Sequence, residues 1–197
     1  MSLPKSPRPA KLVVSLLMKQ TELITPIAEG LIKEMGAIDM VSPWMPFNYT
    51  HYYEAEMGTP LKRRVITFKR LIEQDTLAYV KLATNKLEQR NAIAGQRQIN
   101  IDPGYLLRSR FILATGKNYA HRIYLGKGIY ADLTLIFQKG AFRKLPWTYP
   151  DYADPEMLAC LMAVRRKYVE DIKAGQCEKN TLNGQTANAE CEKKSDD

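Results

Sequence analysis

The sequence predicts an α+β fold, specifically a ferredoxin-like two-layer sandwich with an added β-hairpin and a C-terminal helix. Strand-like and helix-like segments interleave in the order β-α-β-β-α-β, and the segment Arg97–Tyr152 carries strand-like runs separated by Gly-centred turns. A chain of 197 residues is long enough for one domain with its own core. We expect that domain at residues 11–173, between an extended Pro-rich segment at 1–10 and a disordered polar tail at 174–197.

The first β-α-β unit follows from the spacing of apolar residues. Lys11–Met18 is an apolar run and predicts a buried strand. Thr21–Met35 repeats apolar residues every third or fourth position, which predicts a helix, and Gly36 is placed to end it. Ala37–Val41 predicts a second strand, and an unusually aromatic loop follows it.

The second unit is read in the same way. Lys62–Phe68 is rich in β-branched residues and predicts a strand. Asp75 is placed as the N-cap of a helix that ends near Asn91. From Ile99, apolar and polar residues alternate as in a strand, and Asp102-Pro103-Gly104 is expected to end that strand in a turn.

A hairpin is predicted next, after a strand at Arg110–Thr115. Its strands are His121–Leu125 and Ile129–Phe137, joined by Gly-Lys-Gly. The expected register gives the hairpin one polar face, on which Arg122 lies opposite Asp132 and Tyr124 lies opposite Tyr130. The other face should belong to the core, with Ile123, Leu125, Leu133 and Phe137. A final helix is expected to begin at Asp154-Pro155-Glu156.

Composition narrows the class of protein. The net charge is +8, and it rises to about +10 without the acidic tail at 174–197. A basic body favours anionic partners, so we expect a nucleotide or RNA as partner. No apolar run is long enough to span a bilayer, so no membrane partner is expected. Cys160, Cys177 and Cys191 fit no zinc spacing, which favours a reduced, cytoplasmic protein.

Candidate functional residues gather in Arg97–Tyr152 and in the aromatic loop. No P-loop and no GxSxG motif is present, and no motif identifies a cofactor. The leading hypothesis is therefore a basic, tyrosine-rich cleft for a phosphorylated ligand. Asp102 and His121 are the candidate acid and base. The candidate ligand-binding residues are Arg122, Lys117, Tyr124, Tyr105, His51 and Tyr53.

Two alternatives stay open at this stage. A metal-assisted hydrolase would use His51, Glu54, Asp102 and His121. A non-catalytic interaction scaffold would use the loop Trp44–Tyr53 as an exposed apolar patch. The sequence also leaves open whether the expected pair between Arg122 and Asp132 is structural or functional.

Several motifs in order resemble one known family. They are FNYTHYYEAEMG, RRVITFKRLI, NIDPGYL, HRIYLGKGIYADLTLIF and LPWTYPDY. They resemble the bacterial and archaeal family catalogued as domain of unknown function 4416, over about Pro4 to Lys173. The resemblance implies a small, soluble, cytoplasmic protein, and it supplies no catalytic residue. Some members are labelled GTP-binding proteins, a label that the missing P-loop does not support.

Overall fold

The computed structural model describes residues 2–192, with side chains through 174. Its strands are β1 (Ala10–Met18), β2 (Ile38–Val41), β3 (Met45–Phe47), β4 (Leu61–Ile72), β5 (Ile99–Leu106), β6 (Arg110–Thr115), β7 (Arg122–Gly126), β8 (Ile129–Gln138) and β9 (Ala141–Lys144). Its α-helices are α1 (Ile24–Met35), α2 (Glu54–Met57), α3 (Leu77–Arg90) and α4 (Pro155–Glu192), and short 3-10 helices are η1 (Thr21–Leu23), η2 (Gln74–Thr76) and η3 (Pro150–Tyr152).

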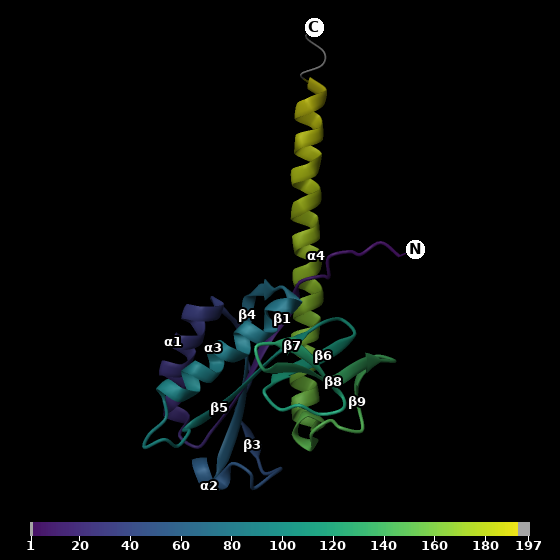
Figure 1. The fold of residues 1–197 in the computed structure, drawn as a ribbon. Helices are drawn as coiled ribbons and strands as arrows, with labels where there is room; N and C mark the ends of the chain where they lie inside the picture. Colours follow the sequence, from purple (N-terminus) through teal and green to yellow (C-terminus); the bar gives the residue numbers. More distant parts are fainter. Residues whose placement is uncertain (1, 193–197) are drawn as a thin grey trace.

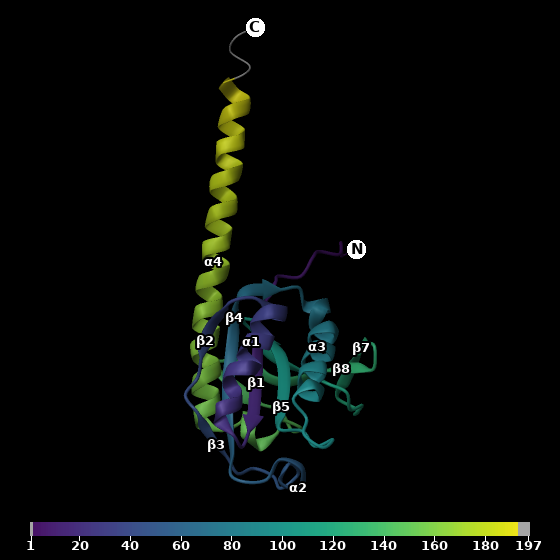
Figure 2. The same cartoon turned by 90° about the vertical axis from the view of Figure 1, so that its left-hand side faces the viewer.

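The predicted α+β class is confirmed, and one antiparallel sheet organises the described residues. The strand order is β2-β4-β1-β5-β6-β8-β7, with β3 beside β4 and β9 beside β8, which makes nine described strands. Figures 1 and 2 show α1 and α3 on one side of the central strands and α4 on the other. None of the described helices is long and apolar enough to cross a membrane.

Alternate residues of β1 face two different cores, as strand geometry requires. Leu12, Val14 and Leu16 pack against α1 and α3, together with Ile27 and Val80. The opposite face packs against α4 through residues such as Val13, Val65, Leu161 and Val164.

One buried charge ties α4 to the sheet. Lys11 of β1 is fully buried, and its ammonium bonds Asp39 and also Asp171 of α4, the latter at 2.8 Å. A buried ammonium is tolerated only when carboxylates pair with it, so these two acids fix where α4 lies on the sheet.

The N-terminus of α3 differs from the prediction. Asp75 does not cap the helix, because η2 comes first and α3 begins at Leu77, with Thr76 at the N-cap and no capping side-chain bond. The start of α4 agrees with the prediction. Asp154 Oδ1 accepts the backbone N–H of Glu156 at 2.8 Å, and Pro155 is the first helical residue.

Side chains from 175 onward, and residues 193–197 altogether, lie outside the described part of the chain. The helix α4 continues to Glu192 and extends beyond the body of the protein (Figure 1). The disordered polar tail expected at 174–197 therefore stays a prediction.

The expected turn at Asp102-Pro103-Gly104 is wrong, because β5 runs straight through it to Leu106. The reason is tertiary. β5 pairs with β1 along its whole length but with β6 only from Gly104 onward. Ile101 directs its N–H and C=O to side chains on the β6 side, so Pro103, two residues on, faces that side too. No strand is paired there, and the missing N–H of proline costs no ladder bond.

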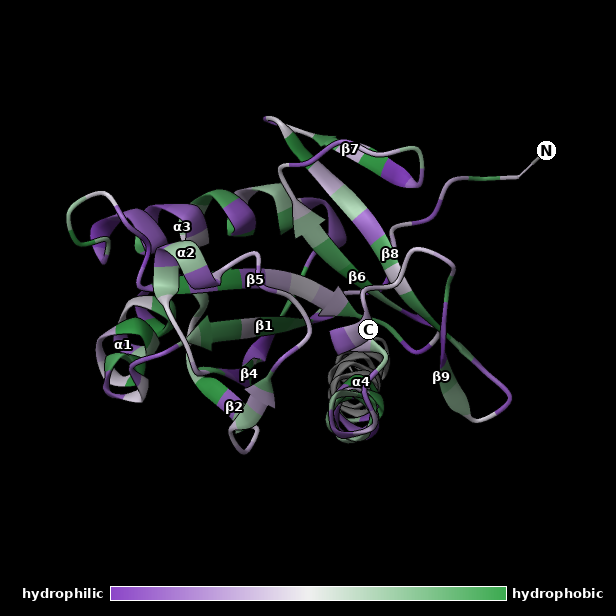
Figure 3. Cartoon of the chain, turned by 90° about the horizontal axis from the view of Figure 1, so that it is seen from below, coloured by the Kyte–Doolittle hydropathy of each residue, from purple (hydrophilic) through white to green (hydrophobic). Residues whose placement is uncertain are grey.

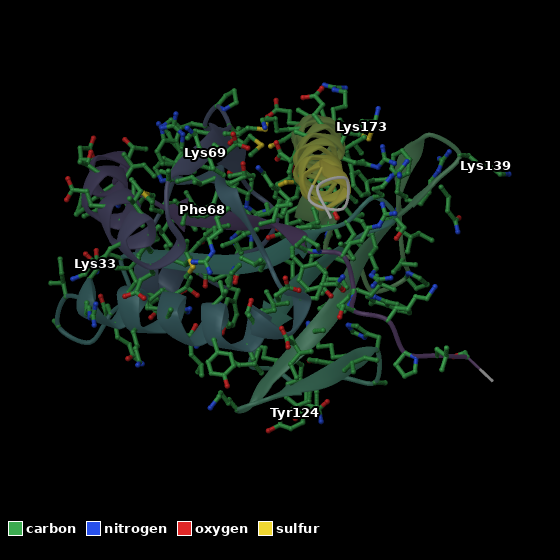
Figure 4. All side chains as sticks on the ribbon, turned by 90° about the horizontal axis from the view of Figure 1, so that it is seen from above. Lys33, Phe68, Lys69, Tyr124, Lys139 and Lys173 are labelled. Atoms are coloured by element: carbon green, nitrogen blue, oxygen red, sulfur yellow. The ribbon has the colours of Figure 1, made fainter. Side chains whose placement is uncertain are left out.

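The hairpin register is confirmed for its main pairs, Arg122 with Asp132 and Tyr124 with Tyr130. The turn closes at Gly126 and Ile129 after a shift in register. The expected core face is wrong at Ile123, which is 71% exposed. The reason is that β7 is the last strand of the sheet, paired only with β8 among the described strands, and none of the described elements buries Ile123. Figure 4 shows Tyr124 at the outer surface, at this edge.

Strands β5 and β6 separate immediately beyond Gly104 and Leu113, the first residues that pair (Figure 3). The two backbones approach closely at this point. A Cβ added to Gly104 would lie 2.3 Å from the carbonyl oxygen of Ile112. Glycine is therefore required where the two strands come together.

We expect Gly104→Ala to lower the free energy of unfolding by about 1–3 kcal/mol or more, because the backbone must move to admit the methyl group. Urea denaturation measures this change. Gly116→Ala is the matched control, since a Cβ at Gly116 meets nothing within 4 Å. Equal denaturation midpoints for the two variants would contradict the close approach.

Candidate functional site

The free edge of β5 is completed by side chains of α3. Lys81 Nζ donates to the carbonyl oxygen of Ile101 at 2.8 Å, and the N–H of Ile101 donates to Glu88 Oε1 at 2.5 Å. Both side chains are buried. They replace the two hydrogen bonds that a neighbouring strand would supply, so the sheet can stay open here without unsatisfied backbone groups.

A cavity of about 660 Å³ occupies this opening, and we call it the wedge cavity. Its walls come from α3, from the separated parts of β5 and β6, from the segment around α2, and from η3. Its lining residues are Phe47, Thr50, Tyr52, Tyr53, Arg63, Lys81, Asn85, Glu88, Gln89, Arg97, Asn100, Asp102, Leu113, Ala114, Thr115, Gly116, Lys117, Arg122, Asp132, Tyr149, Asp151 and Tyr152.

A chain of hydrogen bonds fixes one wall. The guanidinium of Arg97 bonds both carboxylate oxygens of Glu56, and this contact lowers the pKa of Glu56. Arg97 Nη1 donates to Asn100 Oδ1 at 3.1 Å, and Asn100 Nδ2 donates to Asp102 Oδ2 at 2.6 Å. Lys81 lies 3.5 Å from the other oxygen of Asp102. The Asp102 carboxylate is therefore held in one orientation.

A buried arginine forms another part of the lining. The guanidinium of Arg63 lies between the rings of Phe47 and Tyr152, at 4.7 and 5.0 Å, and pairs with Asp151 at 2.5 Å. Burial opposes its charge, but Tyr152 and Asp151 hold the pKa of Arg63 above its ordinary value. Arg63 Nε has no hydrogen-bond partner among the described residues, and the buried Tyr152 hydroxyl interacts with Ser15.

The turn between β6 and β7 carries a different kind of cation. Lys117 is exposed, and its ammonium lies 4.6 Å from the centre of the Tyr52 ring. It pairs with none of the described carboxylates. This lysine is free to meet an anionic group of a ligand.

Four of the candidate residues line the wedge cavity: Tyr53, Asp102, Lys117 and Arg122. Burial, followed by the charge of Asp102, raises the pKa of Tyr53, so this tyrosine keeps its proton at neutral pH. Arg122 is bound within the protein. It donates to Asp132 Oδ2 at 2.8 Å and to the carbonyl oxygen of Lys117 at 2.9 Å, and thereby holds the turn in place.

The other candidates do not line this cavity. His121 stacks on Trp147 at 4.9 Å and lies 3.4 Å from Asp132. Tyr124 is 59% exposed on β7, and Tyr105 is buried with its hydroxyl 3.4 Å from Gln74. His51 is exposed and pairs with the neighbouring Glu54, at 2.6 Å.

The described residues contain no group of three or more His, Cys, Asp or Glu side chains placed to hold a metal ion. His51 and Glu54 pair with each other, whereas Asp102 and His121 belong to separate contacts. The four residues expected for a metal-assisted hydrolase are therefore not assembled into a metal centre. In the aromatic loop, Phe47 is buried and Tyr53 is half-buried, while Tyr52 is 60% exposed.

Sequence reasoning missed Arg63, Lys81, Glu88, Asp151 and Tyr152. A signal existed for Lys81 and Glu88, which lie seven residues apart on one side of α3 and share that side with Asn85. Arg63 stands at an inward position of β4, between the buried Leu61 and Val65. Charged residues at core-facing positions are informative because they are rarely buried without a partner.

Comparison with known families agrees with the motifs. The family model described as Domain of unknown function (DUF4416) matches residues 8–168. The chain belongs to this family. No curated protein and no solved structure matches the chain. The matched region of this DUF4416 protein includes every residue that lines the wedge cavity.

Burial raises the pKa of Glu88 above its ordinary value of 4.5. When a carboxyl group has a higher pKa in the folded state than in the unfolded state, the protein loses stability as pH rises from the ordinary pKa through the folded pKa. Glu88→Gln removes this charge and keeps an oxygen for the N–H of Ile101. We therefore expect the variant to gain stability relative to the wild type as pH rises, by at most about 1.4 kcal/mol per pH unit.

Urea denaturation between about pH 4 and about pH 8 covers the window above the ordinary pKa of a carboxyl group. Glu73→Gln is the control, because Glu73 is exposed. A stability difference for Glu88→Gln that stays flat or shrinks as pH rises would contradict a buried carboxyl with a raised pKa.

Proposed function

We propose that this DUF4416 protein binds a phosphorylated ligand of the nucleotide class in the wedge cavity. The observation that supports the proposal is the combination of a free cation and aromatic rings in one cavity. Lys117 has no carboxylate partner among the described residues, and Tyr52 and Tyr53 stand in the same lining. A phosphate group binds an ammonium, and a base stacks on a tyrosine ring.

The cavity volume favours a single nucleotide over an RNA strand. About 660 Å³ falls within the range of small-molecule sites, roughly 300–1,000 Å³. The lining is also less basic than the sequence suggests. Among the described residues it holds four carboxylates, Glu88, Asp102, Asp132 and Asp151, and five cations, Arg63, Lys81, Arg97, Lys117 and Arg122. Four of the cations contact carboxylates of the protein, so Lys117 carries the attraction for a phosphate.

The predicted ferredoxin-like fold agrees with this position of the ligand site. We infer a ferredoxin-like unit in the elements β1-α1-β2-β4-α3-β5, because their strands lie side by side in the order β2-β4-β1-β5 and are antiparallel. Of the remaining strands, β3 lies beside β4, and β6 to β9 extend the unit beyond β5. The wedge cavity would then lie where the added part leaves the unit. A reduced, cytoplasmic setting agrees with Cys160, which is a free thiol.

Titration calorimetry of the full chain at low salt tests the proposal. The probes are the four ribonucleoside 5′-monophosphates, the corresponding triphosphates and a short single-stranded RNA. We expect a mononucleotide to bind and Lys117→Gln to weaken it by about ten-fold, because a charge-assisted hydrogen bond is lost.

Lys127→Gln is the matched control, since the Lys127 ammonium also lies over a tyrosine ring, 4.9 Å from the centre of Tyr79, outside the wedge cavity. This variant should bind like the wild type. If no nucleotide binds at low salt, or if both lysine variants weaken binding equally, the proposal is wrong.

A further inference from the structure

The Asp102 carboxylate offers hydrogen-bond capacity that the protein does not use. Asn100 donates to one of its oxygens at 2.6 Å, and Lys81 lies 3.5 Å from the other. An ionised carboxylate accepts about four hydrogen bonds. The side chain is 29% exposed and lines the wedge cavity, so the remaining lone pairs are available to a ligand.

Asp102 is also electrically close to the other groups of the wall. Its charge contributes to raising the pKa of Tyr53, Glu88 and Tyr152, after burial as the main cause. A phosphate placed against Asp102 would meet a like charge. The ligand group that fits beside Asp102 must instead donate hydrogen bonds.

Tyr152 also lines the wedge cavity, but its hydroxyl oxygen is buried and interacts with Ser15, so a ligand in the cavity does not reach it. The donors of the ligand therefore face the Asp102 carboxylate. Two neighbouring ligand hydroxyls suit this group, because each can donate to one of its oxygens.

We propose that Asp102 binds the sugar hydroxyls of a ribonucleotide, whose phosphate is directed toward Lys117. This inference rests on the proposed function and narrows the ligand class from nucleotides to ribonucleotides. A ribose carries two neighbouring hydroxyls, which a carboxylate accepts as a pair. A deoxyribonucleotide or a dideoxyribonucleotide lacks one or both of them and leaves the carboxylate without these partners.

Calorimetry on the unaltered chain compares a ribonucleoside 5′-monophosphate with its 2′-deoxy and 2′,3′-dideoxy analogues. We expect the dideoxy compound to bind about 10- to 100-fold more weakly, which is the loss of hydrogen bonds to a charged group. The 2′-deoxy compound should fall between the two. This comparison needs no variant, so it remains valid if a substitution prevents folding.

Two substitutions then assign the discrimination to residues. Asp102→Asn should weaken the ribonucleotide and leave the dideoxy compound nearly unchanged, so that the ratio between them falls toward one. Tyr152→Phe should leave the ratio unchanged, because the buried Tyr152 hydroxyl is out of reach of the ligand. Asp75→Asn, a change at an exposed position, is the control and should keep the full ratio.

The outcomes separate the two proposals. If ribonucleotide and dideoxyribonucleotide bind the wild type equally, the assignment of Asp102 is wrong and nucleotide binding stands. If the wild type discriminates but Asp102→Asn keeps the full ratio, the assignment to Asp102 is likewise wrong. If none of these nucleotides binds, the proposed function is wrong, and this inference fails with it.

Discussion

The structure depends on how the backbone of Ile101 is satisfied. Its N–H bonds Glu88 and its C=O bonds Lys81, both from α3, where an ordinary sheet would use the next strand. This substitution lets β6 leave β5 without exposing unpaired backbone groups. The opening that results is lined by side chains from the helix, from both strands and from η3. The wedge cavity thus exists because side chains of α3, and not a neighbouring strand, bond the backbone of Ile101.

The same exchange sets the electrostatics of the site. Bringing Lys81 and Glu88 to a buried strand edge requires compensating charges nearby, and Asp102 and Arg97 provide them. Arg63 follows the same rule with Asp151. Most charged side chains in the cavity are therefore paired with other side chains of the protein. The ammonium of Lys117 and the spare lone pairs on Asp102 remain for a ligand.

Local patterns in the sequence predicted the elements that depend on local physics. The apolar run of β1, the strand β6 and the pairing of Arg122 with Asp132 follow from periodicity and turn chemistry, and the structure agrees. The exposed Ile123 could not be predicted, since only the position of β7 at the edge of the sheet leaves it uncovered. Arg63 was missed for a related reason: a buried arginine requires Asp151, which lies far away in sequence.

The error at Asp102-Pro103-Gly104 is the most instructive, because the signal lay at the right place in the chain. A proline without an N–H and a glycine without a Cβ are typical of a turn. Here the same two properties allow β5 and β6 to separate. Pro103 needs no partner on the side that β6 has left, and Gly104 admits the backbone of Ile112 at the last point of contact. Asp102 lies two residues beyond Gly104, on the open side of the junction. The motif that resembles a turn therefore encodes where the sheet opens, and it places the carboxylate that we assign to the ligand at the start of the opening.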